Sequence, residues 1–265
     1  MNKKAVVFDN SGTLIKRYKI LKNVVNKEFI TDKNSFEIIH NFESAALVIL
    51  QFNTSCLLKL DPNTKISDLL SDYNIEFSVS YSSTNLNNDD ILDIIKNDDN
   101  AVISDIIDGF SILKKQVPNM EICNGTALII DCKNKKILYT ITTAGKLFDN
   151  ALYTVNKLKN RGYEIFIASG DRIGAIKTLT KFLDIDSSHG FPTASPIGKK
   201  NIVKDLQSEG YNVTMVGDGP NDYFALNQAD CGILTIAQSF IEEDYLLVAS
   251  DYIINDLIEI LNILY

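Results

Sequence analysis

Three polar side chains come directly after short apolar runs, and their chemical types suit phosphoryl transfer. Asp9 follows the run KAVVF, Ser169 follows a second run of this kind, and Asp218 follows a third run and a glycine. A carboxylate can attack a phosphoryl group and form an acyl phosphate, which water then hydrolyses. Asp9 suits this role, because the N–H groups of the turn after it, Asn-Ser-Gly-Thr, can face the phosphoryl oxygens.

A metal ion and hydrogen-bond donors are needed for this reaction, because a carboxylate and a phosphate dianion repel each other. Asp218 is the natural second carboxylate for Mg²⁺, which takes one or two carboxylates, a phosphate oxygen and waters. The hydroxyl of Ser169 and the N–H of Gly170 can both donate to phosphoryl oxygens. We therefore expect Mg²⁺ as the cofactor, bound beside Asp9.

A lysine is needed to balance the combined charge of Asp9 and the phosphate. Lys199 begins a predicted helix after Pro196, and Asp222 lies one turn beyond Asp218 and can hold the ammonium group. Each segment also has a purely structural reading as a turn, a helix cap or a loop, and a lysine next to Lys200 is often a solvated helix start. Their fixed order at the ends of successive strands makes chance a poor explanation.

The elements that carry these residues alternate regularly from about residue 149. Apolar strands are predicted at 163–168, 213–216, 231–234 and 252–254, with amphipathic helices between them. In the first helix Asp149 is expected as the cap and Leu152 on the apolar face. This alternation predicts an α/β fold, a doubly wound parallel sheet with helices on both faces. Ligands bind beyond the carboxyl ends of such strands, so the three polar residues should meet at one rim.

The region from 15 to 123 breaks this rhythm and is richer in Asn, Asp and Ser. We therefore assign 1–14 and 124–265 to the catalytic core and 15–123 to an inserted cap domain of mixed α+β character. Residues 126–131 and 137–142 are predicted to form a β-hairpin that returns the chain to the core. The apolar stretch from Leu47 to Phe52 is assigned to the cap's own interior.

Composition excludes several classes of function. The chain has 265 residues and a net charge of −8, with no run of Lys and Arg. Electrostatic binding to nucleic acid or to anionic lipid is therefore not expected. No stretch approaches the ~20 apolar residues of a membrane span, and the N-terminus lacks an apolar signal core. We expect a cytoplasmic protein without a membrane partner, and the sequence does not indicate an oligomeric state.

The motifs DNSGTL, SGD, P-x-x-K and VGDGPND with A-L-x-x-A-D together resemble the haloacid dehalogenase superfamily. Within it, the chain is most similar to the phosphorylation domain of P-type ATPases and their soluble phosphatase relatives, over residues 4–14 and about 124–235. The resemblance implies a phosphorylated Asp9, with Ser169 and Lys199 on the phosphoryl group. The metal ligands that it implies are Asp9, Asp218, Asp222 and the backbone carbonyl of Ser11. Asp222 would also support Lys199. The residues that it implies around the phosphate are Asn10, Ser11, Gly12, Thr13, Gly170 and Asn221.

Two positions depart from the family pattern. Phosphatases of this superfamily carry a second Asp two residues after the nucleophile as general acid and base, and here that position is Ser11. Such a group contributes roughly 10²–10⁴ in rate, so hydrolysis of the aspartyl phosphate should be slow and good leaving groups should suffer least. Exchange of Ser11 for Asp is predicted to raise turnover. The lysine that follows the nucleophile in the pumps is Asn10 here.

Three functions remain open on these residues. The leading one is a Mg²⁺-dependent phosphohydrolase that cleaves a small phosphorylated metabolite through an aspartyl phosphate on Asp9. The second is a slow ATPase or phosphotransferase, although 15–123 carries no Lys-Gly-Ala motif and no glycine-rich phosphate loop. The third is a non-catalytic regulator that binds a phosphorylated ligand, and the joint retention of Asp9, Lys199 and Asp218 argues against it.

Overall fold

The protein is described by a computed structural model for residues 3–31, 35–84, 87–117, 123–238 and 244–265. Its contacts divide the chain into two compact units. The first comprises Met1–Arg17 and Gly145–Tyr265, and the second comprises Tyr18–Ala144. Along the chain, the second unit is therefore inserted between the two segments of the first.

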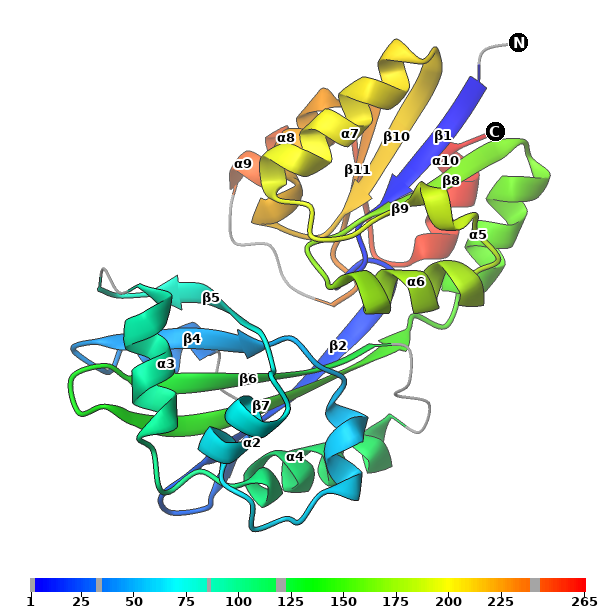
Figure 1. The fold of residues 1–265 in the computed structure, drawn as a ribbon. Helices are drawn as coiled ribbons and strands as arrows, with labels where there is room; N and C mark the ends of the chain where they lie inside the picture. Colours follow the sequence, from blue (N-terminus) through cyan, green and yellow to red (C-terminus); the bar gives the residue numbers. More distant parts are fainter. Residues whose placement is uncertain (1–2, 32–34, 85–86, 118–122, 239–243) are drawn as a thin grey trace. The chain divides into compact units, whose positions relative to one another are not determined.

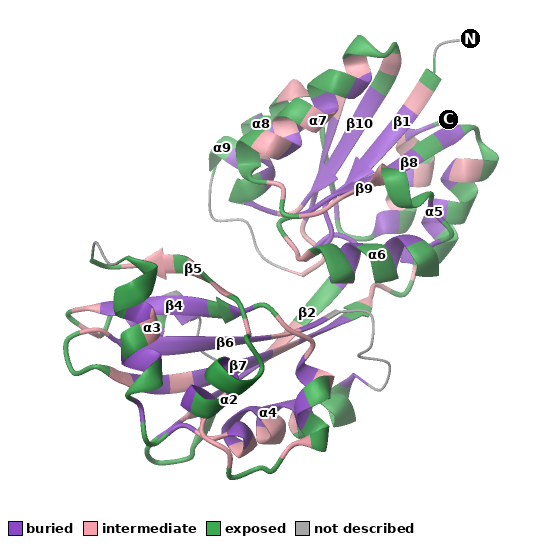
Figure 2. Cartoon of the chain, viewed as in Figure 1, coloured by how far each residue is buried: buried purple, intermediate pink, exposed green. Residues whose placement is uncertain are grey.

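The first unit is built on a six-stranded sheet in the order β12-β11-β10-β1-β8-β9, in which every neighbouring pair is parallel. Its central strand β1 is buried from Ala5 to Phe8, as the continuous apolar run requires when helices cover both faces of a parallel sheet (Figure 2). The bounds of the strands are β1 Lys3–Phe8, β8 Tyr163–Ala168, β9 Gly190–Phe191, β10 Tyr211–Gly217, β11 Cys231–Thr235 and β12 Tyr252–Ile254.

Helices cover both faces of this sheet (Figure 1). Three of them, α7, α8 and α9, pack Val203, Leu226 and Leu246 against Ala5 and Val7 of β1. Figure 1 shows α5 and α10 on the opposite face. The predicted doubly wound α/β fold is confirmed. The bounds of the helices are α5 Ala151–Asn160, α6 Ile173–Phe182, η3 Ser187–His189, α7 Pro196–Ser208, η4 Pro220–Asp222, α8 Tyr223–Gln228, α9 Asp244–Val248, η5 Leu257–Glu259 and α10 Ile260–Ile263.

Helix α5 differs in detail from the expectation. Its N-cap is Asn150, and the carboxylate of Asp149 accepts a hydrogen bond from Lys146 at 2.9 Å instead of capping the helix. Leu152 is 39% exposed, because the buried face is formed by Ala151 and the residues at 154, 155 and 158. The predicted cap and the apolar role of Leu152 were wrong, since the helix starts later than its polar residues suggest.

The second unit has its own six-stranded sheet in the order β3-β2-β7-β6-β4-β5. The helices α2, α3 and α4 contribute Leu69, Ile91 and Ile106 to an apolar cluster with Val48 and Leu50. A second cluster joins α1 to Leu47 and other strand residues. Leu47, Val48 and Leu50 are interior, as expected, whereas Ile49 is 37% exposed and the predicted interior role is wrong at that position. The bounds are β2 Ile15–Asn23, β3 Phe29–Ile30, α1 Ser35–Ile39, β4 Ala45–Leu50, η1 Thr54–Lys59, α2 Ile66–Asp72, β5 Phe77–Ser82, α3 Asn88–Lys96, α4 Ile103–Gln116, β6 Cys123–Asp131 and β7 Lys136–Leu147.

The boundaries of the insertion lie elsewhere than expected. The predicted hairpin is present as β6 and β7, but it belongs to the sheet of the second unit and not to the catalytic core. Strand β6 pairs antiparallel with the whole of β4, from Ala45 opposite Asp131 to Leu50 opposite Thr126. The division therefore falls after Arg17 and after Ala144 rather than after residues 14 and 123.

Candidate active site

The strand β1 delivers Asp9 to the rim of the parallel sheet. The N–H of Asp9 donates to the carbonyl of Val216 in β10 at 2.9 Å, and the chain then turns sharply. Asp9 is only 2% exposed. Its Oδ1 accepts a hydrogen bond from Nζ of Lys199 at 2.5 Å, while its Oδ2 is buried without a hydrogen-bond partner. One oxygen of the carboxylate is thus fixed and the other is available.

The first turn of α7 supplies Lys199. Ser195 caps this helix by accepting the N–H of Gly198 at 3.1 Å, and Pro196 occupies its start, where a missing N–H costs nothing. Lys199 is 1% exposed, and its ammonium also donates to Oδ1 of Asp222 at 2.7 Å. The ammonium group in the site is therefore that of Lys199 and not that of Lys200.

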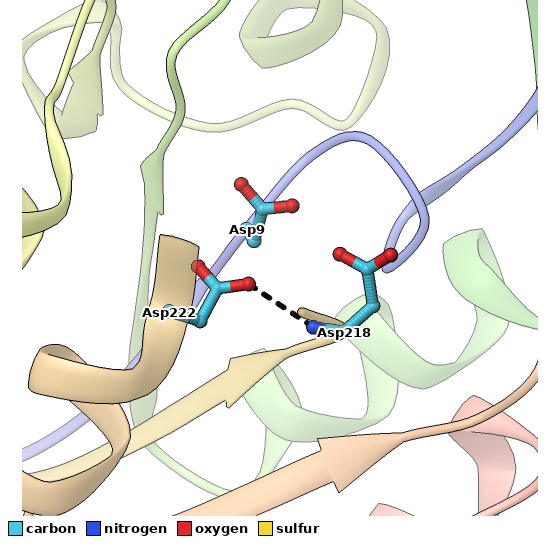
Figure 3. A group of neighbouring side chains, drawn as sticks. All are labelled: Asp9, Asp218 and Asp222. Atoms are coloured by element: carbon cyan, nitrogen blue, oxygen red, sulfur yellow. Dashed lines mark hydrogen bonds between the residues drawn. The ribbon is translucent and has the colours of Figure 1, made fainter. Parts of the chain in front are cut away.

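Asp222 holds the loop after β10 as well as the lysine. Its Oδ2 accepts the N–H of Asp218 at 3.1 Å and that of Gly219 at 3.3 Å; Figure 3 marks the first of these bonds. A Cβ at Gly217 would lie 2.5 Å from the Cβ of Asp222, so the close approach of this side chain requires glycine there. Both oxygens of Asp222 are engaged by the protein itself.

The turn after Asp9 leaves room for Asp218. Gly12 has a φ of +95°, and a Cβ at this position would lie 1.8 Å from Oδ2 of Asp218. Any other residue at position 12 would therefore displace that carboxylate. Oxygens of Asp9, Asp218 and Asp222 all lie within 4.8 Å of one another (Figure 3).

Three carboxylates crowd this cluster, and among the described residues only the ammonium group of Lys199 forms ion pairs with them, while Arg17 partly offsets the charge of Asp218. Burial raises the pKa of Asp9 well above its usual value, and Asp222 adds to the rise, whereas Lys199 opposes it. Burial and Asp222 also raise the pKa of Asp218 to about 6. Burial alone would lower the pKa of Lys199, but Asp9 and Asp222 outweigh it and hold that pKa above its ordinary value. The site therefore favours a further cation.

The donor set fits a hard divalent cation. All the available ligand atoms are oxygens, which Mg²⁺ and Ca²⁺ prefer. Oδ2 of Asp9 is buried and unpartnered, a costly state for a carboxylate oxygen unless a cation or a ligand donor completes it. Asp9 and Asp218 are the residues best placed to hold the ion, because the oxygens of Asp222 already accept hydrogen bonds.

A second group of site residues gathers around Asp171. Its Oδ2 accepts hydrogen bonds from Asn10 Nδ2 at 2.7 Å, from Ser169 Oγ at 2.8 Å and from Ser11 Oγ at 3.2 Å. Asp171 is a site residue to which the sequence pattern gave no role. Its position as the third residue of the SGD motif was the signal that could have identified it.

The structure also places the remaining predicted residues. Thr13 is fully buried and its Oγ1 has no hydrogen-bond partner. Gly170 is exposed next to Ser169 after β8, and Asn221 is exposed in η4 beside Asp222. Their roles at a phosphate, like that of the carbonyl of Ser11 at a metal, remain predictions.

The chain is similar to several known proteins. The curated soluble P-type ATPase-like phosphatase of Methanocaldococcus jannaschii is 34% identical over 235 residues, which cover 88% of this chain and 83% of that protein. The probable copper-importing P-type ATPase A of Enterococcus hirae is 33% identical over 124 residues, 47% of this chain and 17% of that protein. A solved structure of a phospho-aspartyl intermediate analogue of phosphoserine phosphatase matches 100% of this chain and 100% of that chain, with a TM-score of 0.47 and 17% identity.

The chain thus spans most of the first relative and less than a fifth of the second. Within the ranges that the structure describes, no helix has the length and apolar character of a membrane span. The family model for haloacid dehalogenase-like hydrolases matches residues 3–230, which is most of the sequence. The predicted resemblance is confirmed, and the chain belongs to the haloacid dehalogenase-like hydrolase family.

Proposed function

We propose that this hydrolase is a Mg²⁺-dependent phosphatase that cleaves a small phosphorylated metabolite through an aspartyl phosphate on Asp9. The observation that supports it most directly is the state of the Asp9 carboxylate. Lys199 fixes one oxygen, while the other is buried without a partner at the carboxyl end of the central strand. The similarity to a protein named as a phosphatase supports the same reaction.

The first half of the reaction forms the covalent intermediate. A carboxylate oxygen of Asp9 attacks phosphorus, the bond from phosphorus to the ester oxygen breaks, and the ester oxygen takes a proton from water and leaves as the alcohol. Lys199 bonds to Oδ1 of Asp9 and so reduces the repulsion between the carboxylate and the incoming dianion. Asp222 keeps the ammonium group in this position.

The second half restores Asp9. A water molecule attacks phosphorus and gives a proton to bulk water, and the bond between phosphorus and the Asp9 oxygen breaks to release inorganic phosphate. Asp9 and Asp218, with the carbonyl of Ser11, would hold a bound Mg²⁺, which supplies positive charge to the phosphoryl oxygens. Because Ser11 is not itself an efficient acid or base at neutral pH, we expect this half to be slow.

The two alternatives lead to different results in one experiment. A slow ATPase or phosphotransferase would consume ATP faster than small monoesters, and its support is the partial match to a P-type ATPase. A non-catalytic phospho-ligand binder would turn over nothing, and membership of a hydrolase family argues against it. The absence of a nucleic-acid partner and a cytoplasmic location remain predictions from the sequence.

The test is a panel of phosphorylated metabolites, aryl phosphates and ATP, assayed with and without Mg²⁺. The expected result is metal-dependent release of phosphate that Asp9→Asn abolishes, while the control Asp205→Asn, an exposed residue of α7, leaves it unchanged. Acid quenching during turnover should trap a phosphorylated wild-type chain and no phosphorylated Asp9→Asn chain. Turnover that survives Asp9→Asn would refute the nucleophile.

A further inference from the structure

The carboxylate of Asp171 accepts hydrogen bonds from donors that the proposed reaction assigns to the phosphoryl group. One of its oxygens, Oδ2, accepts from three different side chains, those of Asn10, Ser11 and Ser169. All three side chains belong to segments that follow β1 and β8 at the rim of the sheet. A single carboxylate oxygen with three donors resembles the environment that a phosphoryl oxygen would require.

The backbone holds Asp171 in this position. The N–H of Thr193 donates to the carbonyl of Asp171 at 2.9 Å, and the N–H of Ala194 donates to the carbonyl of Ser169 at 2.8 Å. The N–H of Asp171 donates to Oγ of Ser169 at 3.1 Å. These bonds fix the backbone of the segment, and the three donors on Oδ2 fix the orientation of the carboxylate.

The hydroxyl of Ser169 can serve only one acceptor at a time. A hydroxyl group has a single proton, and in this structure that of Ser169 goes to Asp171 at 2.8 Å. A phosphoryl oxygen that takes this proton must displace Asp171 from it, and the same holds for Ser11. The two hydroxyl protons are thus either on Asp171 or on the phosphate, whereas Nδ2 of Asn10 carries a second N–H that can serve another acceptor.

Asn10 shows that the contact with Asp171 decides how these side chains are oriented. Its Nδ2 donates to Asp171 at 2.7 Å, while its Oδ1 is left buried without a partner. An unpaired buried amide oxygen is unfavourable, so the charged hydrogen bond outweighs that loss. The orientation of the amide follows from the carboxylate.

We propose that Asp171 is a positioning residue that holds these donors in the empty site and competes with phosphate for them. This inference rests on the proposed function, because it takes the donors to be phosphate ligands. The consequence concerns the product in particular. Inorganic phosphate must be released after each turnover, and a fixed carboxylate that reclaims the donors and repels the anion favours its departure.

The test compares phosphate binding in Asp171→Asn and in the wild type. The affinity for inorganic phosphate, measured by calorimetry in the presence of Mg²⁺ and as inhibition of aryl phosphate hydrolysis, should increase by about 10- to 100-fold, as expected when one nearby negative charge is lost. Asp205→Asn, which removes a remote exposed carboxylate, should leave the affinity unchanged. Thermal unfolding verifies the fold, and Asp171→Ser replaces the first variant if that one does not fold.

A second comparison separates competition for donors from charge alone. In a Ser169→Ala background the gain from Asp171→Asn should shrink, because one of the released donors is gone. An equal gain in both backgrounds, or no gain in a folded Asp171→Asn protein that still hydrolyses aryl phosphates, would overturn the inference and leave the proposed function intact. A wild type that neither hydrolyses aryl phosphates nor binds phosphate would overturn both.

Discussion

Replacement of Lys199 by Met tests the electrostatic account of the site most directly. The ammonium group of Lys199 bonds to Asp9 at 2.5 Å and to Asp222 at 2.7 Å, and all three side chains are at most 2% exposed. Methionine has a similar length and apolar stem but no charge. The variant therefore keeps the packing and leaves buried carboxylates without their counter-charge.

The expected cost is large. Removing one partner of a buried ion pair typically destabilises a protein by about 3–5 kcal/mol. For a chain of this size, each kcal/mol lowers the unfolding temperature by about 2–4 °C, so we expect a decrease of about 6–20 °C at pH 7.5 without metal. The matched control is Lys200→Met at the next position, where the side chain is half-buried and outside the cluster, and it should change the temperature by at most a few degrees.

The pH dependence of this cost has a definite sign. The pKa of Asp9 is already raised in the folded state by burial and by Asp222, and loss of Lys199 raises it further. A carboxyl group whose folded-state pKa is raised favours the fold below its unfolded pKa and loses that contribution as the pH rises through the folded value. The penalty in Lys199→Met should therefore be larger at pH 7.5 than at pH 5, measured by thermal unfolding. Equal unfolding temperatures for Lys199→Met and Lys200→Met at pH 7.5, or a penalty that grows towards pH 5, would refute the reasoning.

Three further predictions concern the metal and the proton. Burial and Asp222 raise the pKa of Asp218 to about 6. The affinity for Mg²⁺, measured by calorimetry, should therefore rise between pH 5 and pH 7.5 as this ligand loses its proton. A constant affinity would argue against Asp218 as a ligand. Gly12→Ala should abolish the stabilisation of the protein by Mg²⁺ in thermal unfolding, because the added Cβ would lie 1.8 Å from Asp218. The control is Gly162→Ala, because Gly162 also has a positive φ, +81°, but an added Cβ would meet no atom within 4 Å. This control should cost only about 1–2 kcal/mol of backbone strain and should still be stabilised by Mg²⁺. Ser11→Asp should raise the rate of monoester hydrolysis by up to about 10²-fold in steady-state assays, and an unchanged rate would indicate that another group already transfers the proton.

The fold of the first unit could be predicted because its signals are local. The apolar runs of β1, β8 and β10 and the glycines that end the helices are visible in the sequence, and β8 and β12 occupy the predicted residues. The boundary of the insertion could not be predicted in this way. A β-hairpin has the same pattern in either sheet, and only the pairing of β6 with β4, about 80 residues apart in sequence, decides where it belongs.

Some features of the site could likewise be predicted from local sequence patterns, and others could not. The position of Asp9, Ser169 and Asp218 at one rim follows from the sequence pattern, because the topology of a parallel sheet brings the carboxyl ends of its strands together. That Lys199 rather than its neighbour reaches Asp9 is seen in the folded chain alone, because a helix turns its consecutive side chains to different faces. Asp171 likewise became visible only through three side-chain contacts, two of which join it to residues 160 and 161 positions away. Local sequence patterns indicate where a strand ends. The acceptor to which a side chain donates its hydrogen bond depends instead on distances that only the folded chain defines.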